Sequence, residues 1–225
     1  MRFPGIIFDF NGVLWWDQHL QEKSWIDFAQ AFRGRTFSEQ EFAIHVHGRN
    51  MVHTLEFLAG HSLNQEQVAL LGEQKEAIYR QLCLVEEQDF RLSPGAVELL
   101  EFLVQRGIRR TIATASGRRN LDFFIEHLEL EHWFSIDSIV YDDGSRSGKP
   151  APDFYLQAAG NLGLPPSRCV VVEDSYSGIQ AAVSARIGHI IALGPHTNHE
   201  MLAAIDGVDT VIETLADIQR KQLFD

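Results

Sequence analysis

The segment at residues 6–14 constrains the fold more than any other part of the chain. In it an apolar run, residues 6–8, stops at the carboxylate of Asp9 and is soon followed by Asn11 and Gly12. This order predicts a buried strand whose carboxyl end opens into a tight turn. Ligands of open α/β sheets bind at such strand ends, so Asp9 can coordinate a cation, attack an electrophile, or do both in turn. The alternative is that its side chain only caps the turn.

Three later segments place further polar residues beside predicted strands or helices. Residues 109–117 form a β-rich run that ends in hydroxyl side chains and a glycine. Lys149 lies on a loop stiffened by two prolines, just ahead of a helical pattern. A second apolar strand ends at Glu173 and Asp174. Each segment alone is compatible with an ordinary turn at the end of a strand. Only the four segments in this order indicate a functional site.

Taken in this order, the four segments resemble the four motifs of the haloacid dehalogenase superfamily, and of its phosphatase and phosphomutase branch in particular. The resemblance covers nearly the whole chain. It implies that Asp9 is the nucleophile, Thr114 the phosphate-binding hydroxyl and Lys149 the charge-balancing lysine. It also implies that Glu173 and Asp174 form the acidic pair of a magnesium site.

The expected metal site is built from oxygen atoms alone, which suits Mg²⁺. Asp9 and Asp174 are expected to ligate the ion directly, and Glu173 through a water. The backbone carbonyl of Asn11 is the remaining protein ligand, which does not depend on the side chain at that position. The expected substrate is a small phosphorylated metabolite, of which sugar phosphates are one class.

Five residues are expected to bind this substrate: Gly12, Ala115, Ser116, Arg49 and Lys75. Lys75 precedes Tyr79 by four residues, as in helical caps of the superfamily, yet an ordinary exposed lysine on an amphipathic helix explains it equally well. A metal site at His45, His47 and His53 is disfavoured against scattered surface histidines, because alternation in a short segment is weak evidence.

Asn11 departs from the superfamily, whose phosphatases usually carry a second aspartate two residues after the nucleophile. Such an aspartate exchanges a proton with the leaving alcohol and the attacking water, which a carboxamide cannot do near neutral pH. We therefore expect a magnesium-dependent phosphatase, made slow by Asn11. The alternative is a regulatory protein that binds phosphate and metal without turnover. A sugar phosphomutase is a weaker option, since Gln21 stands about where the related mutases carry a cap histidine.

The distribution of strands and helices predicts an α/β protein. Residues 15–88 show only helical patterns, whereas the remainder alternates strand and helix, including a strand at residues 136–141. We expect a Rossmann-like parallel sheet with helices on both faces in residues 1–14 and 89–225. Residues 15–88 would form an inserted small α-helical cap domain, as the resemblance also implies.

Composition limits the partners. The net charge of −12 over 225 residues argues against non-specific binding of nucleic acid. No apolar run reaches the roughly 18 residues of a membrane span, so no membrane partner is expected. Cys83 and Cys169 lie in apolar runs and are expected to be buried thiols in a reducing compartment. A cytoplasmic monomer or weak dimer is the expectation.

Overall fold

The structure, a computed structural model, describes residues 2–46, 49–85 and 90–225. His47 and the predicted domain boundary at residues 88 and 89 lie outside the described residues. The chain forms two compact units, each of which is described by itself. The larger unit combines Met1–Trp16 with Arg91–Asp225, and the smaller one is Asp17–Phe90.

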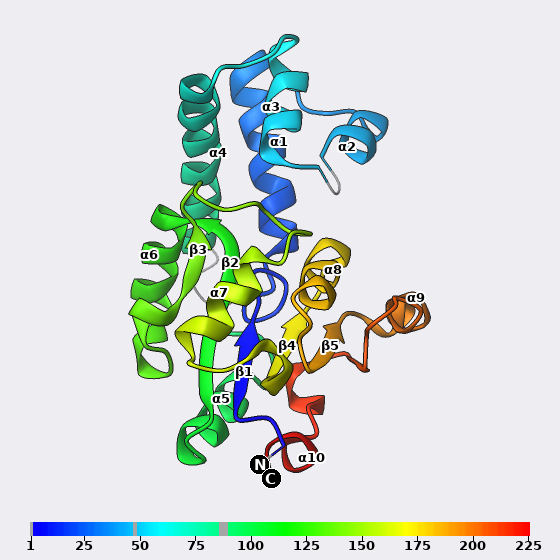
Figure 1. Ribbon diagram of the computed structural model, residues 1–225. Coiled ribbons are helices and arrows are strands. Elements are labelled where there is room, and N and C mark those ends of the chain that lie inside the picture. The colour runs from blue at the N-terminus through cyan, green and yellow to red at the C-terminus, as the bar shows by residue number, and fades with distance from the viewer. Residues whose placement is uncertain (1, 47–48, 86–89) are drawn as a thin grey trace. The chain divides into compact units, whose positions relative to one another are not determined.

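The larger unit is built on one six-stranded sheet in the order β3-β2-β1-β4-β5-β6 (Figure 1). All of its paired neighbours run parallel, and in the centre Ile7 lies opposite both Thr111 and Val171. This confirms the predicted fold class. The strands are β1 Gly5–Phe8, β2 Arg109–Gly117, β3 Val140–Asp142, β4 Cys169–Glu173, β5 His189–Leu193 and β6 Thr210–Ile212.

Helices cover both faces of this sheet, which explains why β1 and β4 are buried along their whole length. On one face Ile7 and Val171 belong to the same buried cluster as residues of α7 and α8. On the other face the ring of Phe10 stacks on Phe124 of α6, with ring centroids 4.4 Å apart. The helices are α5 Ala96–Gln105, α6 Arg118–His127, α7 Asp153–Asn161, α8 Tyr176–Ser184, α9 His199–Ala203 and α10 Arg220–Phe224.

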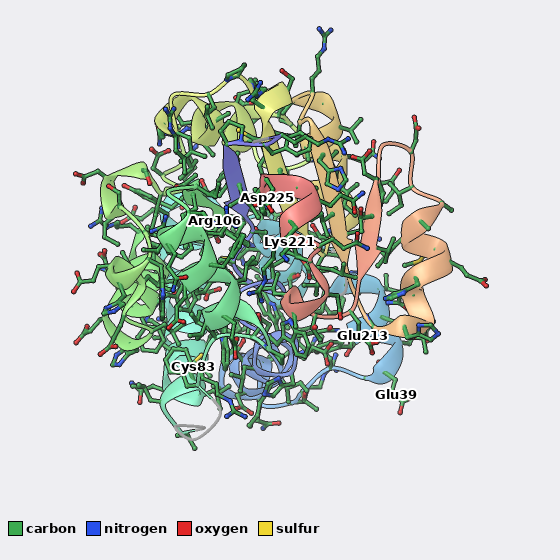
Figure 2. The ribbon with its side chains drawn as sticks, turned by 90° about the horizontal axis from the view of Figure 1, so that it is seen from below. Glu39, Cys83, Arg106, Glu213, Lys221 and Asp225 are labelled. Carbon is green, nitrogen blue, oxygen red and sulfur yellow. The ribbon has the colours of Figure 1, made fainter. Side chains whose placement is uncertain are left out.

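The two ends of the chain lie side by side in this unit (Figure 1). The backbone N–H of Phe3 donates to the carbonyl of Leu223 at 3.0 Å. The last residue, Asp225, forms an ion pair of 3.2 Å with Arg106, just after α5 (Figure 2). The short α10 is therefore fastened to both the first strand and a neighbouring helix.

The strand predicted at residues 136–141 is wrong over its first four residues. Residues Ile136–Ser138 form a 3₁₀ turn, and β3 begins only at Val140. The Ser138 hydroxyl donates to the carbonyl of Ser135 at 2.7 Å, and its N–H donates to the same carbonyl at 2.9 Å. Serine side chains commonly bond to nearby backbone groups in this way, and such bonds compete with the hydrogen bonds between strands.

In the smaller unit the regular structure of the described residues is entirely helical. Its core gathers Phe28, Phe37, Leu55 and Leu58. Ser38 and Glu41 form a capping box at the start of α2, since the Ser38 hydroxyl accepts from the N–H of Glu41 at 3.1 Å. Among the described residues no helix combines the length and apolarity needed to cross a bilayer. The helices are α1 Gln18–Arg33, α2 Glu39–His45, α3 Met51–Ala59 and α4 Gln65–Val85.

Candidate active site

Three carboxylates meet at the carboxyl ends of two adjacent strands. The N–H of Asp9 donates to the carbonyl of Val172 at 3.0 Å, which extends the β1–β4 ladder by one residue and brings Asp9 beside the end of β4. Ligand oxygens of Asp9, Glu173 and Asp174 all lie within 4.8 Å of one another. Residues separated by more than 160 positions in the chain therefore form one acidic cluster.

Lys149 reaches this cluster from the loop before α7. Its ammonium donates to Oδ1 of Asp9 at 2.6 Å and to Oε1 of Glu173 at 2.5 Å. The side chain is only 7% exposed, and its Nζ lies 5.0 Å from the ring centroid of Tyr155. A lysine held in this way is not a solvated loop residue, because it joins the two strand ends.

Glu173 is surrounded by protein donors. Its Oε1 accepts from Lys149 and from the hydroxyl of Tyr155, the latter at 2.8 Å. Its Oε2 accepts from the N–H groups of Asp174 and Ser175, both at 2.9 Å, and from the Ser175 hydroxyl at 3.0 Å. With five donors and no exposed surface, this carboxylate is best suited to orienting Lys149 and the start of α8.

The pKa shifts of the cluster show how the charges compete. Burial and the neighbouring carboxylates raise the pKa of Asp9 and of Asp174, although Lys149 opposes both shifts. Burial would raise the pKa of Glu173 as well, but Lys149 and the hydrogen bonds outweigh it and lower that pKa. Burial would lower the pKa of Lys149, yet the two carboxylates raise it. Three carboxylates thus share one ammonium, which leaves negative charge uncompensated.

This charge imbalance is what a divalent cation would relieve. The available donors are carboxylate oxygens, which hard ions such as Mg²⁺ prefer. Asp9 and Asp174 are the members with oxygens suited to direct ligation, since Glu173 is engaged by its five donors. The cluster therefore fits the expected metal on its own chemistry.

Gly12 is required for the acidic cluster to close. Its φ of 82° lies in the left-handed region, and a Cβ built on it would collide with the carboxylate of Asp174. Gly178 in the first turn of α8 has a similar role, because a Cβ there would collide with the Glu173 carboxylate. Both glycines allow backbone to approach the acids closely.

The end of β2 supplies the remaining predicted residues of this unit. Thr114 is buried, and its hydroxyl oxygen accepts from the N–H of Ser116 at 3.0 Å. The Ser116 hydroxyl in turn donates to Oδ1 of Asn11 at 2.8 Å. Ala115 between them is exposed. The turn after β1 is thereby tied to the end of β2, and the carboxamide of Asn11 is given a defined orientation.

Arg49 and Lys75, the other predicted substrate-binding residues, belong to the helical unit. Lys75 is 2% exposed and donates to Gln21 at 2.6 Å and to Glu76 at 3.0 Å. Arg49 is exposed and donates from Nε to the carbonyl of Ile44 at 2.9 Å.

The sequence pattern suggested that the histidines of the helical unit are scattered over its surface. The structure instead brings two of them together. Nδ1 of His45 lies 3.2 Å from Nε2 of His53, and both side chains are half-buried. The His45 ring also stacks on Phe57, with ring centroids 3.7 Å apart. His45 lies on α2 and His53 on α3, so their pairing depends on how the two helices pack and cannot be predicted from their spacing in the sequence.

Two residues of the acidic site were missed by the sequence analysis. Tyr155 lies on a helix whose apolar pattern predicts core packing, and it is indeed in the core while its hydroxyl reaches Glu173. Ser175 caps α8 by accepting from the N–H of Gly178 at 3.1 Å, in addition to its two bonds to Glu173. A serine between an acidic strand end and a helix is a recognisable N-cap signal. The tyrosine carried no such signal.

The parallel sheet and the acids at its carboxyl edge place the chain among α/β proteins that bind ligands at their strand ends. More particularly, the chain belongs to the haloacid dehalogenase-like hydrolases, whose family model matches residues 3–186. The predicted family is confirmed, and the protein is a hydrolase.

Several known proteins are similar over most of their length. A phosphorylated carbohydrates phosphatase of Thermotoga maritima is 31% identical over 188 residues, which cover 82% of each chain. Hexitol phosphatase A of Escherichia coli is 29% identical over 219 residues, 97% of this chain and 94% of the other. A solved structure of a HAD hydrolase, family IA, variant 3, from Entamoeba histolytica has a TM-score of 0.91 at 36% identity. It covers 98% of this chain and 97% of its own.

Proposed function

We propose that the protein is a magnesium-dependent phosphatase of small phosphorylated carbohydrates that works through an aspartyl-phosphate at Asp9. The observation that carries the proposal is the meeting of Asp9, Glu173 and Asp174 within 4.8 Å, with Lys149 bonded to two of them. Phosphoryl transfer needs an in-line nucleophile and positive charge around the transferred group. This cluster offers both.

In the proposed first step the Asp9 carboxylate attacks the phosphorus, and the bond from phosphorus to the substrate's alcohol oxygen breaks. Lys149 holds Oδ1 of Asp9 in place and contributes positive charge near the transferred group. The hydroxyl of Thr114 and the N–H of Ala115 would donate to phosphoryl oxygens. In the second step water attacks the phosphorus, which releases inorganic phosphate and restores the Asp9 carboxylate.

Mg²⁺, when bound, supplies the charge that allows a carboxylate and a phosphate dianion to approach each other. We assign its ligands to Asp9, Asp174 and the backbone carbonyl of Asn11. Glu173, whose carboxylate already accepts from five donors, orients Lys149 beside the ion's site. Gly12, in the turn after β1, and Ser116, near the end of β2, support this arrangement. They do so through the close approach to Asp174 and the bond to Asn11.

Asn11 sets the expected rate. Its carboxamide can donate a hydrogen bond to an oxygen of the substrate, but it has no proton to transfer near neutral pH. The leaving alcohol must then take its proton from water. We therefore expect a slow enzyme that favours substrates with good leaving groups, whereas complete loss of turnover would make the protein a phosphate-binding regulator.

The substrate class rests on the relatives. The two curated relatives described above are named for phosphorylated carbohydrates and for hexitols. We assign catalysis to residues 1–14 and 89–225 and substrate choice to a cap of residues 15–88. Within that cap Arg49 has guanidinium donors beyond the one it uses, whereas Lys75 must exchange a present partner to bind a substrate.

The test is phosphate release from a panel of hexose phosphates, hexitol phosphates and p-nitrophenyl phosphate. Each is assayed with Mg²⁺ and with a chelator in its place. Release should require Mg²⁺, and Asp9→Asn should lower it by about 10⁴-fold or more. Asp137→Asn, at an exposed aspartate outside the cluster, is the matched control and should behave as the unaltered protein. Equal background release by all three proteins would overturn the proposal.

A further inference from the structure

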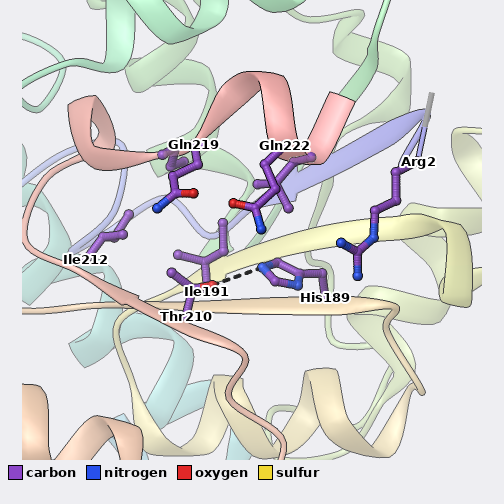
Figure 3. Close-up of a pocket in the computed structure, with 9 residues that line it drawn as sticks. Arg2, His189, Ile191, Thr210, Ile212, Gln219 and Gln222 are labelled. Carbon is purple, nitrogen blue, oxygen red and sulfur yellow. Dashed lines mark hydrogen bonds between the residues drawn. The ribbon is translucent and has the colours of Figure 1, made fainter. Parts of the chain in front are cut away.

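A cavity lies in the larger unit, between the neighbouring strands β5 and β6 and the C-terminal segment (Figure 3). We call it the C-terminal cavity. Its volume is about 260 Å³. Buried side chains form its floor: Ile191, Ile212, Ile218 and Leu223.

The C-terminal cavity is far from the acidic cluster along the strands. His189 and Thr210, which line it, are the first residues of β5 and β6, whereas Asp9 follows the last residue of β1. Because all six strands run parallel, these positions are at opposite edges of the sheet. A molecule in this cavity would not compete with a substrate at Asp9.

Polar groups without partners surround the opening. Arg2, Gln219 and Gln222 are exposed and line the cavity, and Figure 3 shows their side chains around it. Within the described part of the chain, the Arg2 guanidinium has no ion-pair or hydrogen-bond partner, and it lies 5.3 Å from the centroid of the Phe3 ring. The amides of Gln219 and Gln222 likewise accept and donate no hydrogen bond there. These groups are available to a ligand.

The charge balance of the lining is positive. Nε2 of His189 lies 3.1 Å from the Thr210 hydroxyl, and Nδ1 lies 3.7 Å from the carboxylate of Asp209. Burial lowers the pKa of His189, which favours the uncharged ring. Asp209 is not part of the lining, and its carboxylate accepts from the N–H of Ile190 at 2.8 Å. Arg2 is thus the one full charge among the lining residues.

We propose that the C-terminal cavity binds a small organic monoanion, namely a carboxylate on a short hydrocarbon body. The guanidinium of Arg2 matches a carboxylate in a bidentate pair, and the glutamine amides add polar groups to the lining. The isoleucine and leucine floor takes the hydrocarbon part. A cationic ligand would be repelled by Arg2, and the lining has no acidic residue to offset that repulsion. An uncharged ligand would not pair with the charge of Arg2.

The experiment uses the whole chain and hexanoate as the probe. Isothermal titration measures affinity, and methyl NMR of Ile191 and Ile212 reports where the probe binds. Arg2→Gln removes the charge without disturbing the floor. Arg168→Gln, at another exposed arginine outside the cavity, is the matched control. Hexylamine and 1-hexanol have the same hydrocarbon body with a different head group.

Saturable hexanoate binding with shifts at the two methyl positions is expected. Arg2→Gln should weaken it by about tenfold or more, since a charge-assisted pair is lost, and Arg168→Gln should not. Hexylamine should not bind measurably, and 1-hexanol should bind about as weakly as hexanoate binds to Arg2→Gln. Equal affinity in the two variants, equal binding of hexylamine, or no saturation would each overturn the proposal.

Discussion

Lys149 in the larger unit and Lys75 in the helical unit are both buried lysines, with side chains 7% and 2% exposed. Their surroundings differ. Lys149 is held between two buried carboxylates, with a third nearby. Lys75 donates to a neutral amide and to one partly exposed carboxylate, and its ammonium lies 5.2 Å from the Trp25 ring centroid. Burial alone therefore does not distinguish the two lysines, whereas the excess of carboxylates around Lys149 does, and such an excess is typical of functional sites.

The largest expected effect separates the two lysines directly. Lys149→Met should lower kcat by about 10³-fold, because it removes positive charge from the transferred phosphoryl group. Lys75→Met should lower the free energy of unfolding by about 1–3 kcal/mol, with at most about a tenfold change in kcat. Steady-state phosphate release and urea unfolding of both variants measure these effects. If Lys75→Met lowers kcat as much as Lys149→Met, the distinction between the two sites is lost.

The next prediction concerns the proton that Asn11 cannot supply. Asn11→Asp should raise kcat by about 10²-fold on alkyl phosphates, the usual contribution of a positioned acid. The gain should be smaller on p-nitrophenyl phosphate, whose leaving group needs no proton.

Ser116→Ala is the companion variant, because it removes the bond that orients residue 11. It should reduce the gain from Asn11→Asp when the two changes are combined. Activity that appears only after Asn11→Asp would instead favour the regulatory role. Equal gains on both kinds of substrate would rule out an acid at this position.

Removal of the metal should act on stability as well as on rate. Mg²⁺ at about 100 times its Kd should raise the free energy of unfolding by about 2.7 kcal/mol, since it binds the folded cluster. Asp174→Asn should abolish most of this gain, whereas Glu76→Gln beside Lys75 should preserve it. Thermal unfolding with and without Mg²⁺ measures the difference. A gain that survives Asp174→Asn would place the ion elsewhere.

The sequence predicted the functional residues best where polar side chains directly follow a strand. Asp9, Glu173 and Asp174 follow apolar runs, so the strand pattern itself predicts that they meet at one edge of a parallel sheet. Lys149 was found through the resemblance to a known family. The bond between Ser116 and Asn11 spans 105 positions and depends on the register of two strands, which no local pattern specifies.

Tyr155 was missed for a different reason. It lies in the core on a helix that the sequence pattern predicts, but a core tyrosine also needs a partner for its hydroxyl. Its partner, Glu173, is 18 positions away on another element. The same limit applies to Tyr79, whose hydroxyl donates to Asp17 across 62 positions. Periodicity identifies buried faces, whereas the polar pairs within them depend on tertiary packing.

These two tyrosines provide the smallest and most closely matched test. Each hydroxyl is buried and donates to a carboxylate, at 2.8 Å for Tyr155 and 2.7 Å for Tyr79. Tyr155→Phe and Tyr79→Phe should each lower the free energy of unfolding by about 1.5 kcal/mol, because one charge-assisted bond is lost while other donors stay in place. Urea unfolding measures this loss. Only Tyr155→Phe should also lower kcat, by about threefold to tenfold, since Glu173 then orients Lys149 less firmly. An equal loss of kcat in Tyr79→Phe would mean that both clusters serve the reaction, and charge imbalance would no longer distinguish them.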